Sequence, residues 1–326
     1  MKTPIVYTLI SSEKDYFLEE LWVSLYSLRQ FHPEVTVNVL VDEPTKKYVE
    51  RFPELCGMIT NIVIVPVPEN YNAKQRSRVI KTTVRNVIDG AYLFVDTDTV
   101  ICKPLDDIDN LTCDMAAVPD GHLPLSECMF PPTNSVNKIF KTDVSDSKYW
   151  FNSGVMFVAD NEQTRKFYKR WNENWTYSCF EKGQSQDQPA LLATDKEFGY
   201  IISELPGIYN AQVAMSLKYF ADAAIVHWWH MSFIENQDYS PFFSLQIYKD
   251  VKTAKGLTAD IKELIMHCKQ SFVSPTMPVG KEHIYFLFSP AGKIFNRIYK
   301  EGGVACFLMN KCASILEKIH KYTKKK

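Results

Sequence analysis

The chain has 326 residues, which is enough for one sizeable α/β domain with an appendage but too few for several domains with independent cores. Its 46% hydrophobic and 23% charged residues exclude the composition of a disordered protein. The formal net charge of -1 excludes the strongly basic balance with which proteins neutralise nucleic-acid phosphates, so we expect no nucleic-acid partner.

Cysteine usage and the length of the apolar runs indicate a compartment. The 8 cysteines form no C-x-x-C pair and lie mostly among apolar residues, which is typical of buried free thiols in a reducing compartment. The apolar run at residues 5–10 is too short for a signal-peptide core, and no later run approaches about 18 residues. We therefore expect a cytoplasmic protein.

Strands and helices alternate in the first part of the chain. Apolar, β-branched runs predict strands at residues 4–10, 35–41 and 62–67. Apolar residues at helical spacing predict helices at 16–31 and 46–52, each of which ends close to a proline. The pattern is that of successive strand-helix-strand units.

The alternation continues toward two acidic residues. A helix is predicted at residues 74–88, and the strand after it has Val95 as its last apolar residue before Asp96 and Asp98. Prolines make residues 119–150 an irregular excursion. Further strands are predicted at 114–118, 153–158, 200–205 and 223–228, and further helices near 162–180 and 186–194. The whole predicts an α/β fold with a mostly parallel central sheet, in which ligands bind at the carboxyl ends of strands.

The triplet Asp96-Thr97-Asp98 is the most informative motif of the chain. Two carboxylates one residue apart at the end of a strand repel each other unless a cation lies between them. Mn²⁺ or Mg²⁺ fits this position, because these ions take oxygen ligands and can bridge carboxylates to a diphosphate. The alternative is a turn that ends the strand, with Asp98 capping the next segment of the chain.

The segment YLFVDTDTVICKPLDDI at residues 92–108 resembles the metal-binding segment of GT-A nucleotide-sugar glycosyltransferases. The resemblance is to the retaining family-eight group of bacterial lipopolysaccharide galactosyltransferases and glycogenin. Other landmarks occur in the order of that family: PIVYTLISSEKDYF, SRVIKTTVRNVI, YWFNSGVMFV, QDQPALL and VHWWH. The resemblance implies a Rossmann-like GT-A catalytic domain, placed at residues 1–240, and a helical C-terminal extension at residues 241–326.

The resemblance implies a metal site of three side chains. Asp96 and Asp98 match the metal ligands of the family, and Asp96 also lies near the nucleoside ribose. His227 matches the third ligand, with His230 as its rival. The alternative for His227 is a buried histidine that ends a strand beside tryptophans.

Arg78 matches the basic residue of the family that contacts the donor sugar and phosphate. Lys81 and Arg85 lie at i+3 and i+7 from it, so the three side chains could share one helix face. The alternative is that this helix face is exposed to solvent, and for Lys81 and Arg85 this alternative weighs equally with a role in the site.

Asn152, Asp187 and Gln188 resemble the positions that contact sugar hydroxyls, with Asp187 and Gln188 at the catalytic face. Amides and carboxylates suit this task, because sugar hydroxyls both donate and accept hydrogen bonds. The alternative is helix capping, particularly for Asp187 ahead of Pro189. The remaining donor contacts implied by the resemblance are Thr8 and Tyr16, which bracket base and ribose, and Thr97 between the metal ligands.

The resemblance implies a retaining hexosyltransferase. Its donor would be a nucleotide-diphosphate sugar, with UDP favoured, and its acceptor a saccharide or lipid-linked saccharide of surface polysaccharide or lipopolysaccharide synthesis. The chain departs from the family at one point. The family's closing histidine begins a segment with a glycine and a diphosphate-binding lysine, whereas WWHMSFIENQ after His227 has neither. Phosphate binding is therefore expected either to come from other residues or to be weaker.

The end of the chain is a distinct basic segment. Residues 281–326 contain 10 Lys or Arg and only 3 Asp or Glu. Within residues 304–322 seven apolar side chains fall on one helical arc: Val304, Phe307, Leu308, Cys312, Ile315, Leu316 and Ile319. Such a helix can lie on an anionic membrane, which would place the protein peripherally on the cytoplasmic face, or it can pack on the catalytic body.

Two other functions remain open from the sequence. The run LFVDTDTV also fits the opening motif of haloacid-dehalogenase-type phosphatases, in which Asp96 would be a nucleophile. In those enzymes the motif usually lies near the N-terminus, whereas here about ninety residues precede it. The non-enzymatic alternative is a sugar-nucleotide-binding module that keeps the fold without the metal chemistry.

Overall fold

The computed structural model describes residues 1–128, 131–229, 239–273 and 281–323. The chain divides into two units, Met1–Pro275 and Thr276–Lys326, and each is described by itself.

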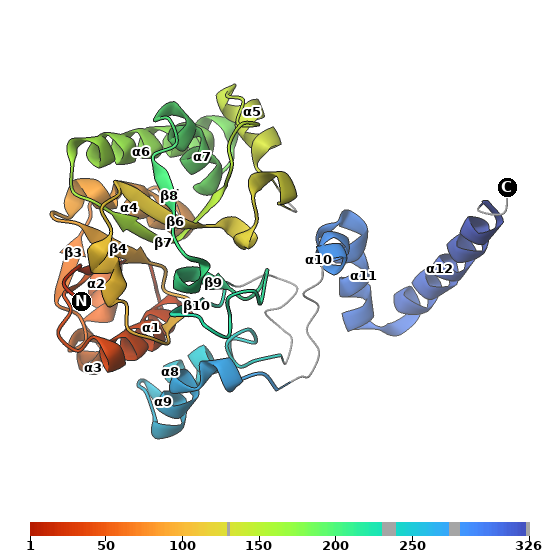
Figure 1. The fold of residues 1–326 in the computed structure, drawn as a ribbon. Coiled ribbons are helices and arrows are strands. Elements are labelled where there is room, and N and C mark those ends of the chain that lie inside the picture. Colours follow the sequence, from red (N-terminus) through yellow and green to blue (C-terminus); the bar gives the residue numbers. More distant parts are fainter. Residues whose placement is uncertain (129–130, 230–238, 274–280, 324–326) are drawn as a thin grey trace. The chain divides into compact units, whose positions relative to one another are not determined.

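A seven-stranded sheet forms the centre of the first unit (Figure 1). Its order is β3-β2-β1-β4-β7-β6-β8. The strands are β1 (Ile5–Leu9), β2 (Val37–Val41), β3 (Asn61–Ile64), β4 (Tyr92–Val95), β6 (Met115–Pro119), β7 (Phe151–Val158) and β8 (Ile202–Glu204). Among them β7 runs antiparallel to β4 and β6, and the other neighbouring pairs are parallel. The expected α/β fold with a mostly parallel sheet is confirmed.

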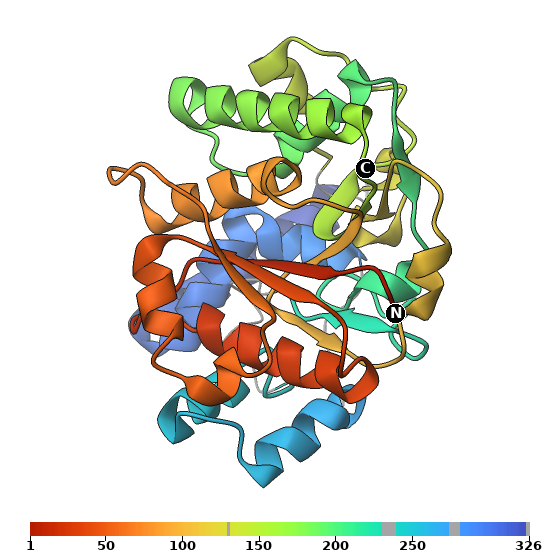
Figure 2. The same cartoon turned by 90° about the vertical axis from the view of Figure 1, so that its left-hand side faces the viewer.

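Helices cover both faces of this sheet. Figure 2 shows α1 on one face and α4 and α6 on the other. On the second face Val6 and Phe94 of the strands pack with Ile80 of α4 and Trp171 of α6 in one buried cluster. Burial of each such side chain contributes about 1.5–3 kcal/mol. The helices are α1 (Phe17–Phe31), α2 (Glu43–Val49), α3 (Pro53–Cys56), α4 (Ala73–Val87), α5 (Thr133–Phe140), α6 (Glu162–Lys182) and α7 (Gln188–Glu197).

The predicted elements differ from the observed ones mainly at their ends. The helix predicted at 46–52 begins earlier, because the Asp42 side chain accepts a hydrogen bond from the Thr45 backbone N–H at 3.0 Å and so caps α2. The excursion at residues 119–150 contains the short helix α5, which the prolines around it concealed. The strand predicted to end at Val95, before the two acids, does end there, and the residues after the acids form a strand of another sheet.

That smaller sheet has three strands in the order β5-β10-β9. They are β5 (Thr99–Ile101), β9 (Ala211–Gln212) and β10 (Ile225–His227). β10 runs antiparallel to β5, with His227 opposite Thr99, and parallel to β9. Strands β5 and β9 are too short to leave a period-2 pattern in the sequence, so they were not predicted.

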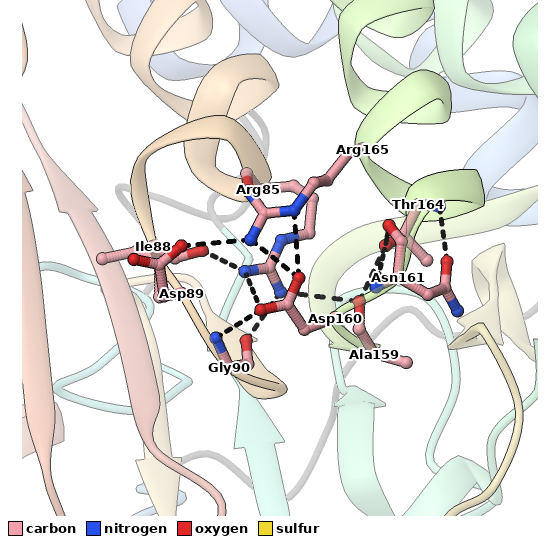
Figure 3. Close-up of polar contacts among 9 residues, drawn as sticks. All are labelled: Arg85, Ile88, Asp89, Gly90, Ala159, Asp160, Asn161, Thr164 and Arg165. Atoms are coloured by element: carbon pink, nitrogen blue, oxygen red, sulfur yellow. Dashed lines mark hydrogen bonds and ion pairs between the residues drawn. The ribbon is translucent and has the colours of Figure 1, made fainter.

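Arg85 closes the end of α4, as Figure 3 shows. Its side chain is fully buried and donates hydrogen bonds to the backbone carbonyls of Ile88 and Gly90. Its guanidinium also lies 3.5 Å from the carboxylate of Asp160, which Arg165 of α6 contacts as well. Arg85 thus joins α4, β4 and α6. The alternative of a solvent-exposed Arg85 is wrong, and it takes no part in a site shared with Arg78.

Two further helices of the first unit follow residue 240. Helices α8 (Gln246–Ala254) and α9 (Ala259–Met266) both contact α1. Lys252 of α8 hydrogen bonds to the carbonyl of Asp15 and lies 3.5 Å from the Glu19 carboxylate. The rings of Trp228 and Phe242 stack at 4.6 Å, which ties this segment to the end of β10.

The second unit contains α10 (Lys281–Phe288), α11 (Pro290–Glu301) and α12 (Gly303–Thr323). The apolar arc expected on its last helix is exposed: Val304, Phe307, Leu308, Ile315, Leu316 and Ile319 are each more than half accessible to solvent. In the described part of the chain, no helix has both the length and the apolarity needed to cross a bilayer.

Candidate metal and donor site

The two aspartates lie where the chain passes from the main sheet into the smaller one. Asp96 comes directly after β4, and its backbone N–H donates to the carbonyl of Gly154 in β7 at 2.7 Å. The hydroxyl of Thr99 donates to the Asp96 carbonyl at 2.9 Å and is itself bonded to Ser24 of α1. The loop from Asp96 to Asp98 is therefore anchored at both ends.

The register between β5 and β10 brings a histidine beside these acids. His227 Nε2 lies 3.0 Å from Asp98 Oδ1, and the backbone N–H of Trp228 donates to the Asp98 carbonyl at 2.9 Å. One ligand atom from each of Asp96, Asp98 and His227 lies within 4.8 Å of the others. Two carboxylate oxygens and one imidazole nitrogen can hold a divalent cation. His230, the rival ligand, lies outside the described residues.

Gly154 lies against this cluster, and its lack of a side chain leaves space for the ligands. A Cβ at this position would lie 2.4 Å from His227 Cε1 and 3.0 Å from Asp96 Oδ2. Real Cβ atoms do not approach other atoms as closely as 2.4 Å, so a side chain here would displace His227, and Asp96 would have to shift by a few tenths of an ångström. This steric constraint explains why Gly154, in the segment FNSGV, is a glycine.

Lys81 reaches the cluster from α4. Its Nζ lies 2.9 and 3.0 Å from the two carboxylate oxygens of Asp96, and its side chain is only 5% exposed. The alternative of a solvent-exposed Lys81 is therefore wrong. Burial raises the pKa of the Asp96 carboxyl above its ordinary value, although the Lys81 ammonium opposes this rise. Burial lowers the pKa of His227, but the charge and hydrogen bond of Asp98 outweigh it and leave that pKa raised.

A second ion pair holds Asp187 beside Arg78. Arg78 Nε lies 3.0 Å from Asp187 Oδ1, and the Ser153 hydroxyl donates to Asp187 Oδ2 at 3.0 Å. Burial raises the pKa of Asp187, but the charges of Arg78 and Lys81 outweigh it and lower the pKa below its ordinary value. Asp187 is thus an anion at neutral pH. The capping alternative is wrong for its side chain, which makes no hydrogen bond to the start of α7.

The amides of Asn152 and Gln188 meet at a residue that was not predicted. Asn152 Nδ2 and Gln188 Nε2 both donate to Asp120 Oδ1, at 2.9 and 3.1 Å. Asp120 comes directly after β6, at the end of a strand like Asp96, and it is buried. Burial raises the pKa of its carboxyl, and the two amide hydrogen bonds oppose the rise. Its position after a predicted strand was the signal that could have identified it.

A cavity of about 470 Å³ opens beside the acids. Of the predicted donor contacts, Thr8, Arg78, Asp96 and Thr97 line it together with Asp98. The other lining residues are Leu9, Ile10, Phe17, Glu20, Ala73, Lys74 and Ser77. Lys74 was not predicted, although its spacing from Arg78 on α4 indicates a shared face.

The other predicted donor contacts do not line this cavity. Asn152, Asp187 and Gln188 belong to the polar contacts described above. Tyr16 lies at the start of α1, where the Lys252 ammonium is 4.9 Å from the centre of its ring.

The sequence profile of Glycosyl transferase family 8 matches residues 8–232, which is more than half of the chain. The chain belongs to glycosyl transferase family 8. This membership makes it a glycosyltransferase, so the alternative of a phosphatase with Asp96 as its nucleophile is wrong. No curated protein matches the chain.

Solved structures share the fold at low identity. Glycosyltransferase GlyE of Streptococcus pneumoniae TIGR4 is 14% identical with a TM-score of 0.51, over 85% of this chain and 67% of its own. The bifunctional glycosyltransferase WbbM is 12% identical with a TM-score of 0.51, over 79% of this chain and only 52%, about half, of its own. Galactosyltransferase LgtC, solved with donor and acceptor sugar analogs, is 16% identical with a TM-score of 0.48. The match covers 84% of this chain and 98% of LgtC. The fold is the expected GT-A fold.

Gly154→Ala is expected to weaken Mn²⁺ binding at least about tenfold, because the added methyl group meets His227 and Asp96 and costs about 1–3 kcal/mol in overpacking. Titration of Mn²⁺ followed by the electron paramagnetic resonance signal of the free ion measures this affinity.

Gly57→Ala is the matched control, because a Cβ at Gly57 meets only ordinary contacts at 3.5 Å and its φ of -62° suits any residue. An unchanged Mn²⁺ affinity in a folded Gly154→Ala protein would contradict the steric account of the site.

Proposed function

We propose that this glycosyltransferase transfers a sugar from a nucleotide-diphosphate donor, with UDP favoured, and that it depends on Mn²⁺ or Mg²⁺. The observation that carries the proposal is the group of Asp96, Asp98 and His227, whose ligand atoms lie within 4.8 Å of one another. Both aspartates line the cavity in which a donor would lie.

The three side chains fit a divalent cation by their chemistry. Asp96, Asp98 and His227 would hold it. The absence of a side chain at Gly154 allows these ligands to lie close together. When bound, such an ion neutralises the negative charge that develops on a departing diphosphate, an effect worth on the order of several kcal/mol. Lys81 already compensates part of the charge of Asp96, so the cation would share this carboxylate with the ammonium.

Two cations of α4 are suited to the phosphates. Lys74 and Arg78 line the same cavity as the acids, and Lys74 is exposed there. They can supply the phosphate binding that the segment after His227, without glycine or lysine, does not offer. The nucleoside would lie along Thr8 and Thr97, with Tyr16 beside the base.

The sugar would lie toward Asp187 and Gln188. Asp187 is anionic and fixed by Arg78 and Ser153, so it can accept hydrogen bonds from sugar hydroxyls without moving. Gln188 and Asn152 donate to Asp120, which fixes their orientation. We assign Asp187 and Gln188 to the catalytic face. Retention of anomeric configuration is part of the proposal and rests on the family resemblance alone.

Asp98→Asn is expected to abolish metal-dependent turnover of the donor. The amide keeps the size of the side chain but removes the charge that binds the cation and faces His227. A panel of nucleotide sugars, assayed for transfer or hydrolysis with Mn²⁺, Mg²⁺ and EDTA, measures the loss and identifies the donor.

Asp260→Asn on α9 is the matched control, since Asp260 is an exposed carboxylate and should leave turnover unchanged. Binding of no donor from the panel would refute the transferase proposal. Donor binding that needs no metal and leads to no turnover would favour the binding-module alternative.

We also propose that the acceptor is a lipid-linked saccharide of surface polysaccharide synthesis, reached at the cytoplasmic face of a membrane. The exposed apolar residues of α12, with the 10 basic residues among residues 281–326, support this. Each basic residue near an anionic surface contributes about 1 kcal/mol, and the apolar arc adds its own burial.

Ile315→Glu is expected to weaken binding to vesicles that contain phosphatidylglycerol by about tenfold or more, because it places a charge on the apolar arc of α12. Ser314→Glu adds the same charge about 100° around the helix from Ile315, outside the apolar arc, and should weaken binding less than about fivefold. Sedimentation with vesicles measures both. Equal effects of the two variants, or unchanged binding after deletion of residues 303–326, would contradict the membrane role.

A further inference from the structure

A line of buried polar side chains lies behind His227. His227 Nδ1 is 2.9 Å from Asn210 Oδ1, and Asn210 Nδ2 donates to Asn152 Oδ1 at 3.0 Å. Asn152 Nδ2 in turn donates to Asp120 Oδ1 at 2.9 Å. All four residues are less than a tenth exposed. The line joins the end of β10 in the smaller sheet to the end of β6 in the main sheet, away from the side of His227 that faces Asp98.

The orientation of Asn152 is fixed from two sides. A carboxylate only accepts hydrogen bonds, so Asn152 turns its NH₂ group toward Asp120. Independently, the backbone N–H of Gly154 donates to Asn152 Oδ1 at 2.9 Å, and a backbone N–H can only donate. This second constraint holds whatever the protonation state of Asp120. The carbonyl oxygen of Asn152 therefore faces Asn210.

The orientation of Asn210 is set by that of Asn152. Asn210 must present its NH₂ group to the Asn152 oxygen, which leaves its own oxygen toward His227. An amide oxygen only accepts, so the proton of the imidazole belongs on Nδ1. Nε2, on the other side of the ring, lies 3.0 Å from Asp98 Oδ1 in the metal cluster, and its proton is the one that a bound cation would replace.

We propose that Asn210 is a positioning residue that holds His227 in the tautomer with its proton on Nδ1, so that Nε2 can ligate a divalent cation. The inference rests on the proposed function, in which His227 is a metal ligand. The short strands of the smaller sheet make the arrangement possible. Asn210 lies directly before β9, and β9 pairs with β10, which ends in His227.

Loss of the Asn210 oxygen would leave a buried N–H of the metal-ligating ring without an acceptor. Groups that hold the second nitrogen of a ligating histidine typically contribute 10–100-fold to metal affinity. Asn210→Leu, which has nearly the same size, is therefore expected to weaken Mn²⁺ binding by about 10–100-fold. Asn210→Asp keeps an acceptor beside Nδ1 and should restore most of the lost affinity.

Asn174→Leu is the matched control. Asn174 of α6 is as deeply buried, and its side chain donates to Thr194 and Glu197 rather than to the line behind His227. This variant should be less stable, but its Mn²⁺ affinity and the NMR signals of the His227 ring nitrogens should not change.

Nitrogen NMR gives a second readout, whose main observation is made on the unmodified protein. In the Mg²⁺-bound protein, long-range ¹H–¹⁵N correlation should show His227 with its proton on Nδ1 in a strong hydrogen bond. His227→Gln assigns this signal among the 7 histidines of the chain. In Asn210→Leu the Nδ1 proton should move upfield and exchange faster with solvent.

The outcomes separate the inference from the proposed function. If the unmodified protein binds no Mn²⁺, both are overturned. If it binds Mn²⁺ and either Asn210→Leu binds it equally well or the Mg²⁺-bound protein carries the His227 proton on Nε2, the inference on Asn210 is overturned while the proposed function stands.

Discussion

The antiparallel pairing of β5 with β10 is the constraint on which the site depends. It sets His227 opposite Thr99 and thus beside Asp98, although more than a hundred residues of chain separate them. A slip of one residue would turn His227 to the other face of the small sheet and remove the third ligand. The pairing is short, and two further bonds hold it: the Thr99 hydroxyl bonds to Ser24 of α1, and the Trp228 N–H donates to the Asp98 carbonyl.

The acids of the site lie beside basic side chains that compensate their charge. Three acids of the site each lie beside a basic side chain: Asp96 beside Lys81, Asp187 beside Arg78, and Asp98 beside His227. A carboxylate buried without such a partner would cost several kcal/mol. At Asp96 and Asp98 the ligand atoms of both acids and of His227 lie within 4.8 Å of one another. A divalent cation there would add positive charge between the two carboxylates, and the missing side chain of Gly154 leaves space for it.

Much of this could be predicted from the sequence, because the acid triplet comes directly after a long apolar strand and the landmarks around it keep the order of the family. The alternation of strands and helices likewise predicted the parallel part of the sheet. The role of Asn210 could not be predicted, since it depends on hydrogen bonds between elements far apart in the chain. For Asp120 the position after a predicted strand was a signal, but its two amide partners come from distant elements and left none. Arg85 shows the opposite error: at helical spacing from Arg78 it indicated a shared face, but it turns into the protein to close the end of α4.

The most direct test of the account is pulsed electron paramagnetic resonance of the protein with Mn²⁺ and UDP. The account predicts that the bound Mn²⁺ couples to one imidazole nitrogen and to phosphorus nuclei of the diphosphate. His227→Gln should remove the nitrogen coupling and keep the phosphorus coupling. Bound Mn²⁺ that shows no coupling to phosphorus, or a nitrogen coupling that survives His227→Gln, would contradict the claim that Asp96, Asp98 and His227 hold the cation against the donor's diphosphate.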